Sequence, residues 1–326
     1  MWWGNPGGSA QSGRSWLSMF GVKGRAAGVI LVATLLLIGL LFPQRRLAMA
    51  ATPAAGRAPE RIVALNGDVA EIIYALGLGG KVVGTDLSAT YPPAAARLHN
   101  IGYQRQLNAE AILALRPTII IGTPDAGPPS VITQLRSSGV RVVILKSSDT
   151  MIPTSLQQAV QTKIAEIASA LGVTATGRRL ARTVTAQIAG AEALAKRART
   201  KPRVIFLLAE AQANTYLIAG KGSGISAMIT AAGGIDAGAA SGIYGYIPLT
   251  PEALVKARPA ILLVFKSSEE SVGGLAGLLK LPGVALTPAG QSKHVLVYED
   301  DFLGNLGPRT GQALNRLVHD FHPELK

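Results

Sequence analysis

Tyr103 precedes Arg105 by two residues, in a stretch that reads GYQRQLNAE (102–110). A phenolate oxygen suits a hard cation such as ferric iron, but a free phenol has a pKa near ~10 and needs help to ionise at neutral pH. A metal ion and a nearby guanidinium both favour the phenolate. If the backbone is extended, Arg105 points to the same side as Tyr103. The residues alone leave two interpretations: Tyr103 is an oxygen ligand to a metal, or it is one of seven tyrosines and packs a loop.

A second pattern occurs twice in the chain. It runs Leu-x-x-Glu, a helical turn, Arg-Pro and a hydrophobic strand, and its copies are LNAEAILALRPTIII (107–121) and LTPEALVKARPAILL (249–263). In each copy, Asn108 or Thr250 can cap a helix whose first turn carries an acid, Glu110 or Glu252. These acids could be ordinary first-turn charges. Two acids at matching positions favour instead a partner with two basic sockets.

Few other residues could do catalytic chemistry. The chain contains no cysteine, which excludes disulfides, a thiol nucleophile, a thiolate metal site and a lipidated cysteine anchor. Its four histidines are spread out, and it has no nucleophile elbow, Walker phosphate loop or H-E-x-x-H zinc motif. Asp300 and Asp301 could form a carboxylate pair, but adjacent strand residues point to opposite faces. We interpret them as a polar strand end and do not expect an enzyme.

The chain is basic, with a formal net charge of +13. Without residues 1–50, which carry five basic residues and no acid, the charge is 13 − 5 = +8. The remaining basic residues are scattered and aromatic residues are few, whereas a nucleic-acid binder would show a basic stripe with interleaved aromatics. We therefore expect no nucleic-acid partner, and the basicity is compatible with an anionic ligand.

The first fifty residues are typical of an export segment. Residues 1–25 carry basic residues and no acid, 26–42 are an apolar run, and AMA (48–50) fits a small-x-small cleavage site. A signal peptide over 1–50 would leave a mature chain that begins at Ala51. The alternative is an uncleaved membrane anchor, because Arg45 and Arg46 lie between the apolar run and the cleavage site.

Short β-branched runs alternate with helical segments in two parts of the chain. The runs are 61–65, 81–86, 118–123 and 140–145 in the first part, and 203–210, 216–220, 260–265 and 294–299 in the second. This alternation predicts an α/β fold with mainly parallel sheets. We expect two α/β lobes, an N-terminal one over 60–153 and a C-terminal one over 201–326.

A region without strand character, 154–200, separates these two parts. Its second half, 177–200, contains no proline and has an apolar stripe at Leu180, Val184, Ile188, Ala191 and Ala195. A helix of twenty-odd residues is ~35 Å long. It could link the two lobes or belong to a single domain, and we favour the link. A single helical crossing would resist bending, so we expect only slight closure on a ligand.

The chain resembles the periplasmic haem-binding proteins of bacterial ABC importers over nearly all of 60–320. These belong to a helix-bridged class that also includes cobalamin- and ferric-siderophore-binding proteins. The stretches that carry the resemblance are RIVALNGDVAEIIYALGLGGKVVGTD (61–86), YPPAAARLHNIGYQRQLNAEAILALRPTIII (91–121), AMITAAGGIDA (227–237), YIPLTPEAL (246–254), LPGVALTPAG (281–290) and LGNLGPRTGQAL (303–314). Within the class, the GYxRxLxAE pattern is the part that points to haem.

The resemblance implies a monomeric periplasmic protein that holds haem in a cleft between its lobes and delivers it to a membrane permease. It implies that Tyr103 is the axial ligand of the haem iron and that Arg105 supports it. It also implies that Glu110 and Glu252 dock onto arginines of the permease. The same fold with a ferric siderophore or cobalamin as ligand is the alternative.

The sequence departs from the family at several positions. Some relatives place a histidine, as a second iron ligand, where this chain has Glu210, so we do not expect a Tyr/His site. Relatives often flank the tyrosine that matches Tyr246 with arginine, but here its neighbours are Gly245 and Ile247.

Other residues could still contact a porphyrin. Tyr244 and Tyr246 could stack on its face or form hydrogen bonds in the cleft. Arg309, at an expected helix start, could bind a propionate with its guanidinium and the backbone N–H groups. The alternative for Arg309 is a solvated residue that caps the helix.

Overall fold

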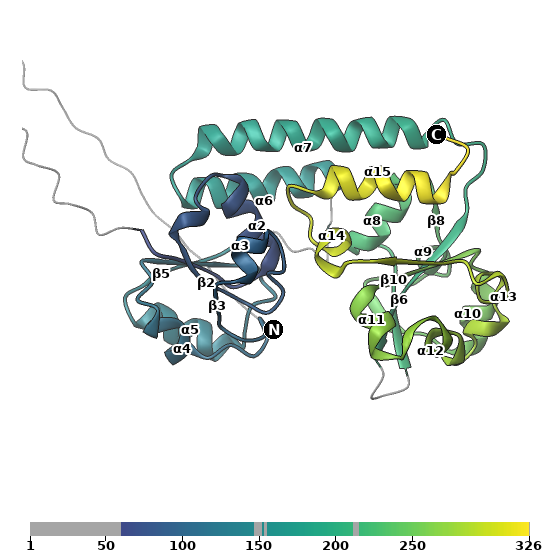
Figure 1. The fold of residues 1–326 in the computed structure, drawn as a ribbon, viewed down its shortest axis with the longest axis horizontal. Helices are drawn as coiled ribbons and strands as arrows, with labels where there is room; N and C mark the ends of the chain where they lie inside the picture. The colour runs from purple at the N-terminus through teal and green to yellow at the C-terminus, as the bar shows by residue number, and fades with distance from the viewer. Residues whose placement is uncertain (1–59, 147–151, 153–154, 211–214, 326) are drawn as a thin grey trace, which may run out of the picture. The chain divides into compact units, whose positions relative to one another are not determined.

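The computed structural model describes residues 60–146, 152, 155–210 and 215–325 (Figure 1). The predicted signal segment lies outside the described residues. Among the described residues, no helix is long and apolar enough to span a membrane. The described chain contains two sheets, each flanked by helices, as the sequence predicted, and the domain limits given above stay predictions.

The N-terminal lobe is built on a five-stranded parallel sheet with the order β3-β2-β1-β4-β5. Its strands are β1 (Ile62–Ala64), β2 (Val82–Thr85), β3 (His99–Asn100), β4 (Ile119–Gly122) and β5 (Arg141–Ile144). Its helices are α2 (Gly67–Ala75), α3 (Pro93–Ala96), α4 (Ala109–Ala114) and α5 (Pro129–Ser137). Each α/β connection returns the chain to a parallel strand, as in other α/β folds.

Alternate residues of β1 point to opposite faces of this sheet. Ile62 and Ala64 belong to a core cluster that includes α2 and α6 (Leu156–Ala170). Val63 belongs to another cluster, with Ile112 of α4 and Leu135 of α5. The helices α2 and α6 therefore cover one face of the sheet, and α4 and α5 cover the other.

The C-terminal lobe contains a six-stranded mixed sheet with the order β11-β10-β6-β7-β9, and β8 pairs with β6. Its strands are β6 (Arg203–Glu210), β7 (Thr215–Ala219), β8 (Ile235–Asp236), β9 (Tyr246–Pro248), β10 (Ile261–Phe265) and β11 (Val295–Tyr298). Strand β7 runs antiparallel to β6 and β9, and the other pairs are parallel.

Helices cover both faces of this second sheet as well. They are α8 (Gly224–Ala231), α9 (Ala237–Ala240), α10 (Pro251–Ala257), α11 (Lys266–Ser271), α12 (Gly274–Lys280), α13 (Pro288–Ser292), α14 (Asp300–Gly304) and α15 (Thr310–Phe321). Val204 and Phe206 share a core cluster with α8 and α15, whereas Ile205 and Leu207 share one with α10, α12 and α13.

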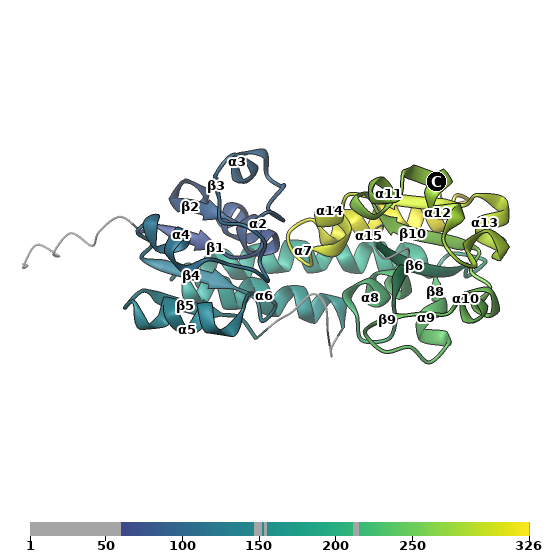
Figure 2. The same ribbon diagram turned by 90° about the horizontal axis from the view of Figure 1, so that it is seen from below.

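The long helix expected between the lobes is α7 (Thr174–Ala195), which starts three residues before the predicted segment and ends five residues before its end. It packs on both α6 and α15 (Figures 1 and 2). Its buried stripe is Ala181, Val184, Ile188, Ala191 and Ala195, while Leu180 is half-buried. We call α6, α7 and α15 the bridging layer, because residues of all three helices belong to a core cluster shared with both sheets.

One local prediction was wrong. Asp300 and Asp301 do not end a strand, because β11 stops at Tyr298 and the two aspartates are the first residues of α14. In a first helical turn, carboxylates face the positive end of the helix dipole, which favours them there.

Candidate functional site

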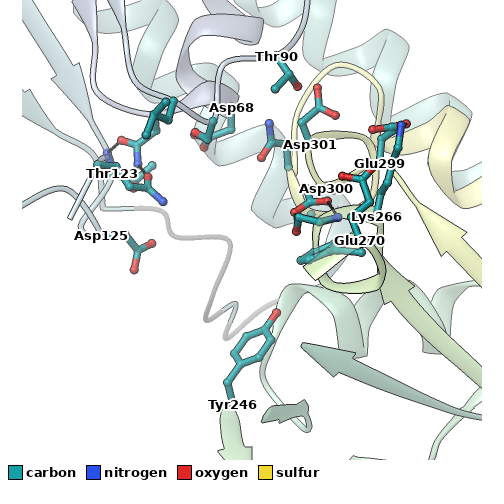
Figure 3. Close-up of a pocket in the computed structure, with 18 residues that line it drawn as sticks. Asp68, Thr90, Thr123, Asp125, Tyr246, Lys266, Glu270, Glu299, Asp300 and Asp301 are labelled. Atoms are coloured by element: carbon teal, nitrogen blue, oxygen red, sulfur yellow. Dashed lines mark hydrogen bonds and ion pairs between the residues drawn. The ribbon is translucent and has the colours of Figure 1, made fainter. Parts of the chain in front are cut away.

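A cavity of about 520 Å³ is lined by residues of both lobes (Figure 3). This volume lies within the range of small-molecule sites. The lining residues are Asn66, Asp68, Leu87, Ser88, Thr90, Gln104, Thr123 and Asp125 from the N-terminal lobe, and Tyr246, Phe265, Lys266, Ser267, Glu270, Glu299, Asp300, Asp301, Gly304 and Asn305 from the C-terminal lobe. We call this cavity the cleft.

The wall from the N-terminal lobe is fixed by hydrogen bonds that start at the loop between β1 and α2. The Asn66 amide donates to the Gln104 side-chain oxygen, and its own oxygen accepts from the Thr123 backbone N–H at 2.7 Å. Asn66 is buried, so its amide is held in one orientation. The side chains of Asn66 and Gln104, tied to the Thr123 backbone, form a preorganised polar surface.

A buried carboxyl supports the neighbouring part of the same wall. Both Asp86 oxygens accept from the Ser88 hydroxyl, at 2.8 and 2.9 Å, and that hydroxyl accepts from the Gly67 N–H at 2.9 Å. Burial raises the pKa of Asp86 to about 7. The loop that carries Leu87 and Ser88 into the cleft is therefore held by a group that titrates near neutral pH.

The cleft is acidic, which the overall basicity of the chain did not predict. Its lining contains one lysine and six carboxyl groups, and the latter belong to Asp68, Asp125, Glu270, Glu299, Asp300 and Asp301. The lysine, Lys266, is 2.8 Å from Glu299. Asp300 accepts hydrogen bonds from the backbone N–H and the hydroxyl of Ser267, at the start of α11. Cations outside the lining pair with three of these acids, Asp68, Asp125 and Asp301, so an anionic group inside the cleft would be repelled mainly near Glu270 and Asp300.

Tyr103 lies in the loop beside the N-terminal wall, next to Gln104, and 44% of it is exposed. Gly102 adopts a φ of +92°, a conformation open mainly to glycine. The Leu87 N–H donates to the Gly102 carbonyl at 3.0 Å, which joins this loop to the loop that holds Leu87 in the cleft. Tyr103 is thus accessible and close in sequence to a lining residue, but it does not itself line the cleft.

Arg105 does not bond to Tyr103 within the described part of the chain. Its guanidinium lies 3.4 Å from the carboxylate of Asp125, which lines the cleft. About half of the Arg105 side chain is exposed. The structure thus places Arg105 at the edge of the N-terminal wall, paired with an acid.

The two tyrosines of the C-terminal lobe differ in position. Tyr246 begins β9, lines the cleft and meets the Phe206 ring edge-on, with the ring centroids 6.4 Å apart. Figure 3 shows its hydroxyl directed toward the cleft. Tyr244 is 64% exposed and does not line the cleft. Of the two, Tyr246 is placed to meet a ligand in the cleft.

Arg309 does not line the cleft. It is the residue before α15, and its guanidinium binds the carboxylates of Glu71 and Asp301. Two acids from different lobes therefore already neutralise the Arg309 charge.

Glu110 and Glu252 are both exposed, and both lie in the first turn of a short helix, α4 or α10. The predicted caps are present: the Asn108 side chain accepts from the Ala111 N–H, and Thr250 accepts from the Ala253 N–H. Both helices cover the sheet faces opposite the bridging layer (Figure 1).

The two helices also end in the same way. Arg61 donates from Nε and Nη2 to the Leu115 carbonyl after α4, and Arg203 donates from the same two atoms to the Ala257 carbonyl in α10. Each donor–acceptor pair is 54 residues apart in sequence. The two lobes therefore present locally equivalent corners.

His99 lies in β3 and is exposed. Glu210 ends β6, and its side chain lies outside the described residues. Within the described ranges, no group of three or more histidine, aspartate or glutamate side chains could hold a metal ion.

The periplasmic binding protein family matches this chain over residues 62–302. The chain belongs to that family. It is therefore a substrate-binding protein of the transport type rather than an enzyme, and the family implies an ABC permease as its partner.

Solved structures of haem-binding proteins resemble this family member over most of its length. The periplasmic haem-binding protein RhuT from Roseiflexus sp. RS-1, in its apo form, is 48% identical, with 82% of this chain and 99% of that chain covered and a TM-score of 0.77. BhuT, in complex with two haems, is 35% identical, with 82% and 99% covered and a TM-score of 0.72. A periplasmic haem-binding protein from Pseudomonas aeruginosa is 33% identical, with 82% and 94% covered and a TM-score of 0.73.

A curated relative is named for another ligand. The cobalamin-binding protein of Halobacterium salinarum is 26% identical over 269 residues, which cover 81% of this chain and 70% of the relative. The family and the fold are thus shared by haem- and cobalamin-binding proteins.

Proposed function

We propose that this protein captures haem in the cleft and delivers it to the permease of an ABC importer. The observation that carries the proposal is the 48% identity to a haem-binding protein whose chain is matched over 99% of its length. The cleft also offers apolar surface for a porphyrin, from Leu87, Phe265 and Tyr246.

In this proposal Tyr103 is the iron ligand. Ferric haem iron accepts a phenolate, and Tyr103 is an exposed phenol in the loop that also carries Gln104 into the cleft. Arg105 lies two residues on and would favour the phenolate through its charge. Its contact with Asp125 is only partly buried, so Arg105 can turn toward a bound ligand.

The acidic lining determines how haem would be oriented. A propionate near Glu270 or Asp300 would be repelled by those carboxylates, and the Lys266 charge is already offset by Glu299. We therefore place the porphyrin ring inside the cleft and its propionates toward the solvent. Tyr246 would contact the ring from the C-terminal side.

Docking onto the permease would use Glu110 and Glu252. Each is exposed on an equivalent corner of its lobe, on the side away from the bridging layer. A partner with two related basic sites could bind both corners together. This geometry suits a permease built from two similar halves.

Export to the periplasm and a monomeric state complete the proposal. Segment 1–50 would act as a signal peptide or stay as an anchor. N-terminal sequencing of the protein from its native envelope should find Ala51 first, and a chain that begins before residue 42 would indicate an anchor.

The same fold with cobalamin or a ferric siderophore as ligand is the second candidate. Two observations favour cobalamin in particular: the cobalamin-binding relative, and Glu270 and Asp300 in the cleft, which suit a ligand without free carboxylates better than one with two.

Parallel titrations with haemin and cyanocobalamin distinguish these candidates. We expect a Soret band shift that saturates at a fixed haemin ratio, and no saturable binding of cyanocobalamin. Saturable cyanocobalamin binding without a haem spectrum would instead support the second candidate. Binding of neither would leave ferric siderophores as the class to titrate.

A further inference from the structure

Arg309 receives a carboxylate and an aromatic ring from each lobe. Its Nε and Nη2 donate to the two oxygens of Glu71 on α2, at 2.9 and 2.8 Å, and Nη2 also donates to Asp301 on α14, at 2.8 Å. The guanidinium carbon lies 3.8 Å from the ring centroid of Tyr91 in the N-terminal lobe and 5.4 Å from that of Phe302 in the C-terminal lobe. A planar guanidinium suits this combination of a bidentate bond with stacking.

This cluster is shielded from solvent. The exposed fractions of the Arg309, Glu71 and Asp301 side chains are 16%, 4% and 12%. Burial raises the pKa of Glu71, and the Arg309 guanidinium acts against that rise. A buried acid that loses its partner is left uncompensated, which is strongly unfavourable. Separating the two lobes at this contact would therefore be costly in free energy.

The cluster is connected to both walls of the cleft. Asp301 itself lines the cleft from the C-terminal lobe. Glu71 lies one helical turn after Asp68, which lines the cleft from the N-terminal lobe and pairs with the buried Lys163 of α6 at 2.8 Å. A movement of Arg309 relative to α2 would therefore change the distance between the two walls.

We propose that Arg309 is an interlobe clasp, a positioning residue that fixes the separation of the cleft walls before any ligand binds. The bridging layer holds the lobes together on one side of the sheets, and the clasp adds a tie at the border of the cleft. The clasp itself rests only on the geometry above, and its effect on haem affinity rests on the proposed function.

Distance measurement in the ligand-free protein tests the clasp directly. The chain contains no cysteine, so spin labels can be attached at Gln134→Cys on α5 and Ala276→Cys on α12, both exposed. Double electron–electron resonance on the labelled full-length chain should give one narrow distance distribution. In Arg309→Gln the distribution should broaden and shift.

Two further variants change the cluster less than Arg309→Gln does. They keep the test valid if Arg309→Gln fails to fold. Arg309→Lys keeps the charge but loses the bidentate geometry, so it should broaden the distribution less. Tyr91→Leu removes one stacked ring at a position that is 42% exposed, and it should broaden the distribution without unfolding the protein. Thr287→Ala is the matched control, because it removes a buried helix cap within the C-terminal lobe and should leave the distance unchanged.

The functional consequence is measured with haemin as the probe. If the arrangement competent to bind falls to about a tenth of the population in Arg309→Gln, the apparent affinity should fall about tenfold. Identical distance distributions in the parent, Arg309→Gln and Tyr91→Leu would overturn the clasp. Because the distance measurement needs no ligand, a failure of haem binding in the parent would contradict the proposed function and leave the clasp standing.

Discussion

Single residues set the charge in and around the cleft, and Asp86, which supports the N-terminal wall, shows how burial raises the pKa of a carboxyl group. Asp86 is 3% exposed, and the Ser88 hydroxyl donates to both of its carboxyl oxygens. Desolvation is the largest cause of its raised pKa, and the Ser88 hydrogen bond acts against it. The protein thus holds the Asp86 proton more tightly than the unfolded chain does.

Stability should consequently fall as the pH rises through the Asp86 transition. The unfolded value is near 3.8 and the folded value is about 7, so the free energy of unfolding should drop between these pH values, by on the order of 4 kcal/mol at most. Asp86→Asn should reduce this slope, because asparagine cannot titrate. Its side-chain oxygen can still accept from the Ser88 hydroxyl, so the local hydrogen bond is kept. Urea unfolding at pH 5 and pH 8 measures the difference.

The control for this prediction is Glu60→Gln, in the surface pair with Lys81. It should keep the parent's slope. Glu71 and Asp236 also have raised pKa values and contribute with the same sign, so Asp86→Asn should keep a residual slope. An unchanged slope in Asp86→Asn would contradict the assignment.

The sequence alone could single out residues by type but not by their distant partners. Tyr103, Arg105 and the two exposed glutamates could be named because their chemistry is visible in a short stretch. The partner of Arg309 could not, since Glu71 lies 238 residues away in the chain. The same holds for the acidic cleft, whose carboxylates come from separate loops and helices of both lobes.

Among the elements, the bridging layer depends on glycines at its closest contacts. A Cβ at Gly177 of α7 would lie 2.3 Å from the Ala168 Cβ of α6, and one at Gly311 of α15 would lie 2.4 Å from the Gln187 Cβ of α7. Such distances are too short for any side chain. These helices can therefore pack this closely only because these positions lack a side chain.

Two glycines of α7 give opposite predictions. Gly177→Ala should destabilise the protein by about 1–3 kcal/mol, because α6 and α7 must separate. Gly190→Ala should stabilise it by up to about 1 kcal/mol, because alanine favours a helix and the space around it is open. Thermal unfolding of both variants checks the signs, and a stabilised Gly177→Ala would show that the α6–α7 contact is looser than described.

Strands that carry a run of β-branched residues were predicted well, and strands without such a run were not. The eight runs of β-branched residues all form strands, because their length and apolar pattern require burial in a sheet. Strands β3, β8 and β9 have only two or three residues and depend on neighbouring strands for pairing. The start of α14 was wrongly predicted as a strand end, because two adjacent acids show neither the helical nor the strand spacing of apolar residues.

For the whole molecule, the equivalent corners predict how it meets its partner. Glu110→Lys and Glu252→Lys should each lower the transport of haem through the permease about tenfold or more, since a reversed charge repels a basic site on the permease. The haemin affinity of the isolated protein should stay unchanged, because both glutamates are exposed and neither lines the cleft. Uptake into cells or into liposomes with the permease measures transport.

The control is Glu324→Lys, an exposed acid just after α15 and therefore in the bridging layer's part of the protein. It should leave transport intact. Equal loss in all three variants would indicate a general charge effect and not docking.

The account depends most on the claim that Tyr103 binds the iron of haem in the cleft, and a haemin titration followed by visible absorption tests it most directly. The parent should give the spectrum of a high-spin ferric haem with a phenolate ligand. Tyr103→Phe keeps the ring but cannot coordinate, so it should lose that spectrum and most of the affinity, while Tyr244→Phe should match the parent. If Tyr103→Phe binds haemin with the parent's spectrum and affinity, the iron ligand lies elsewhere and the central claim is wrong.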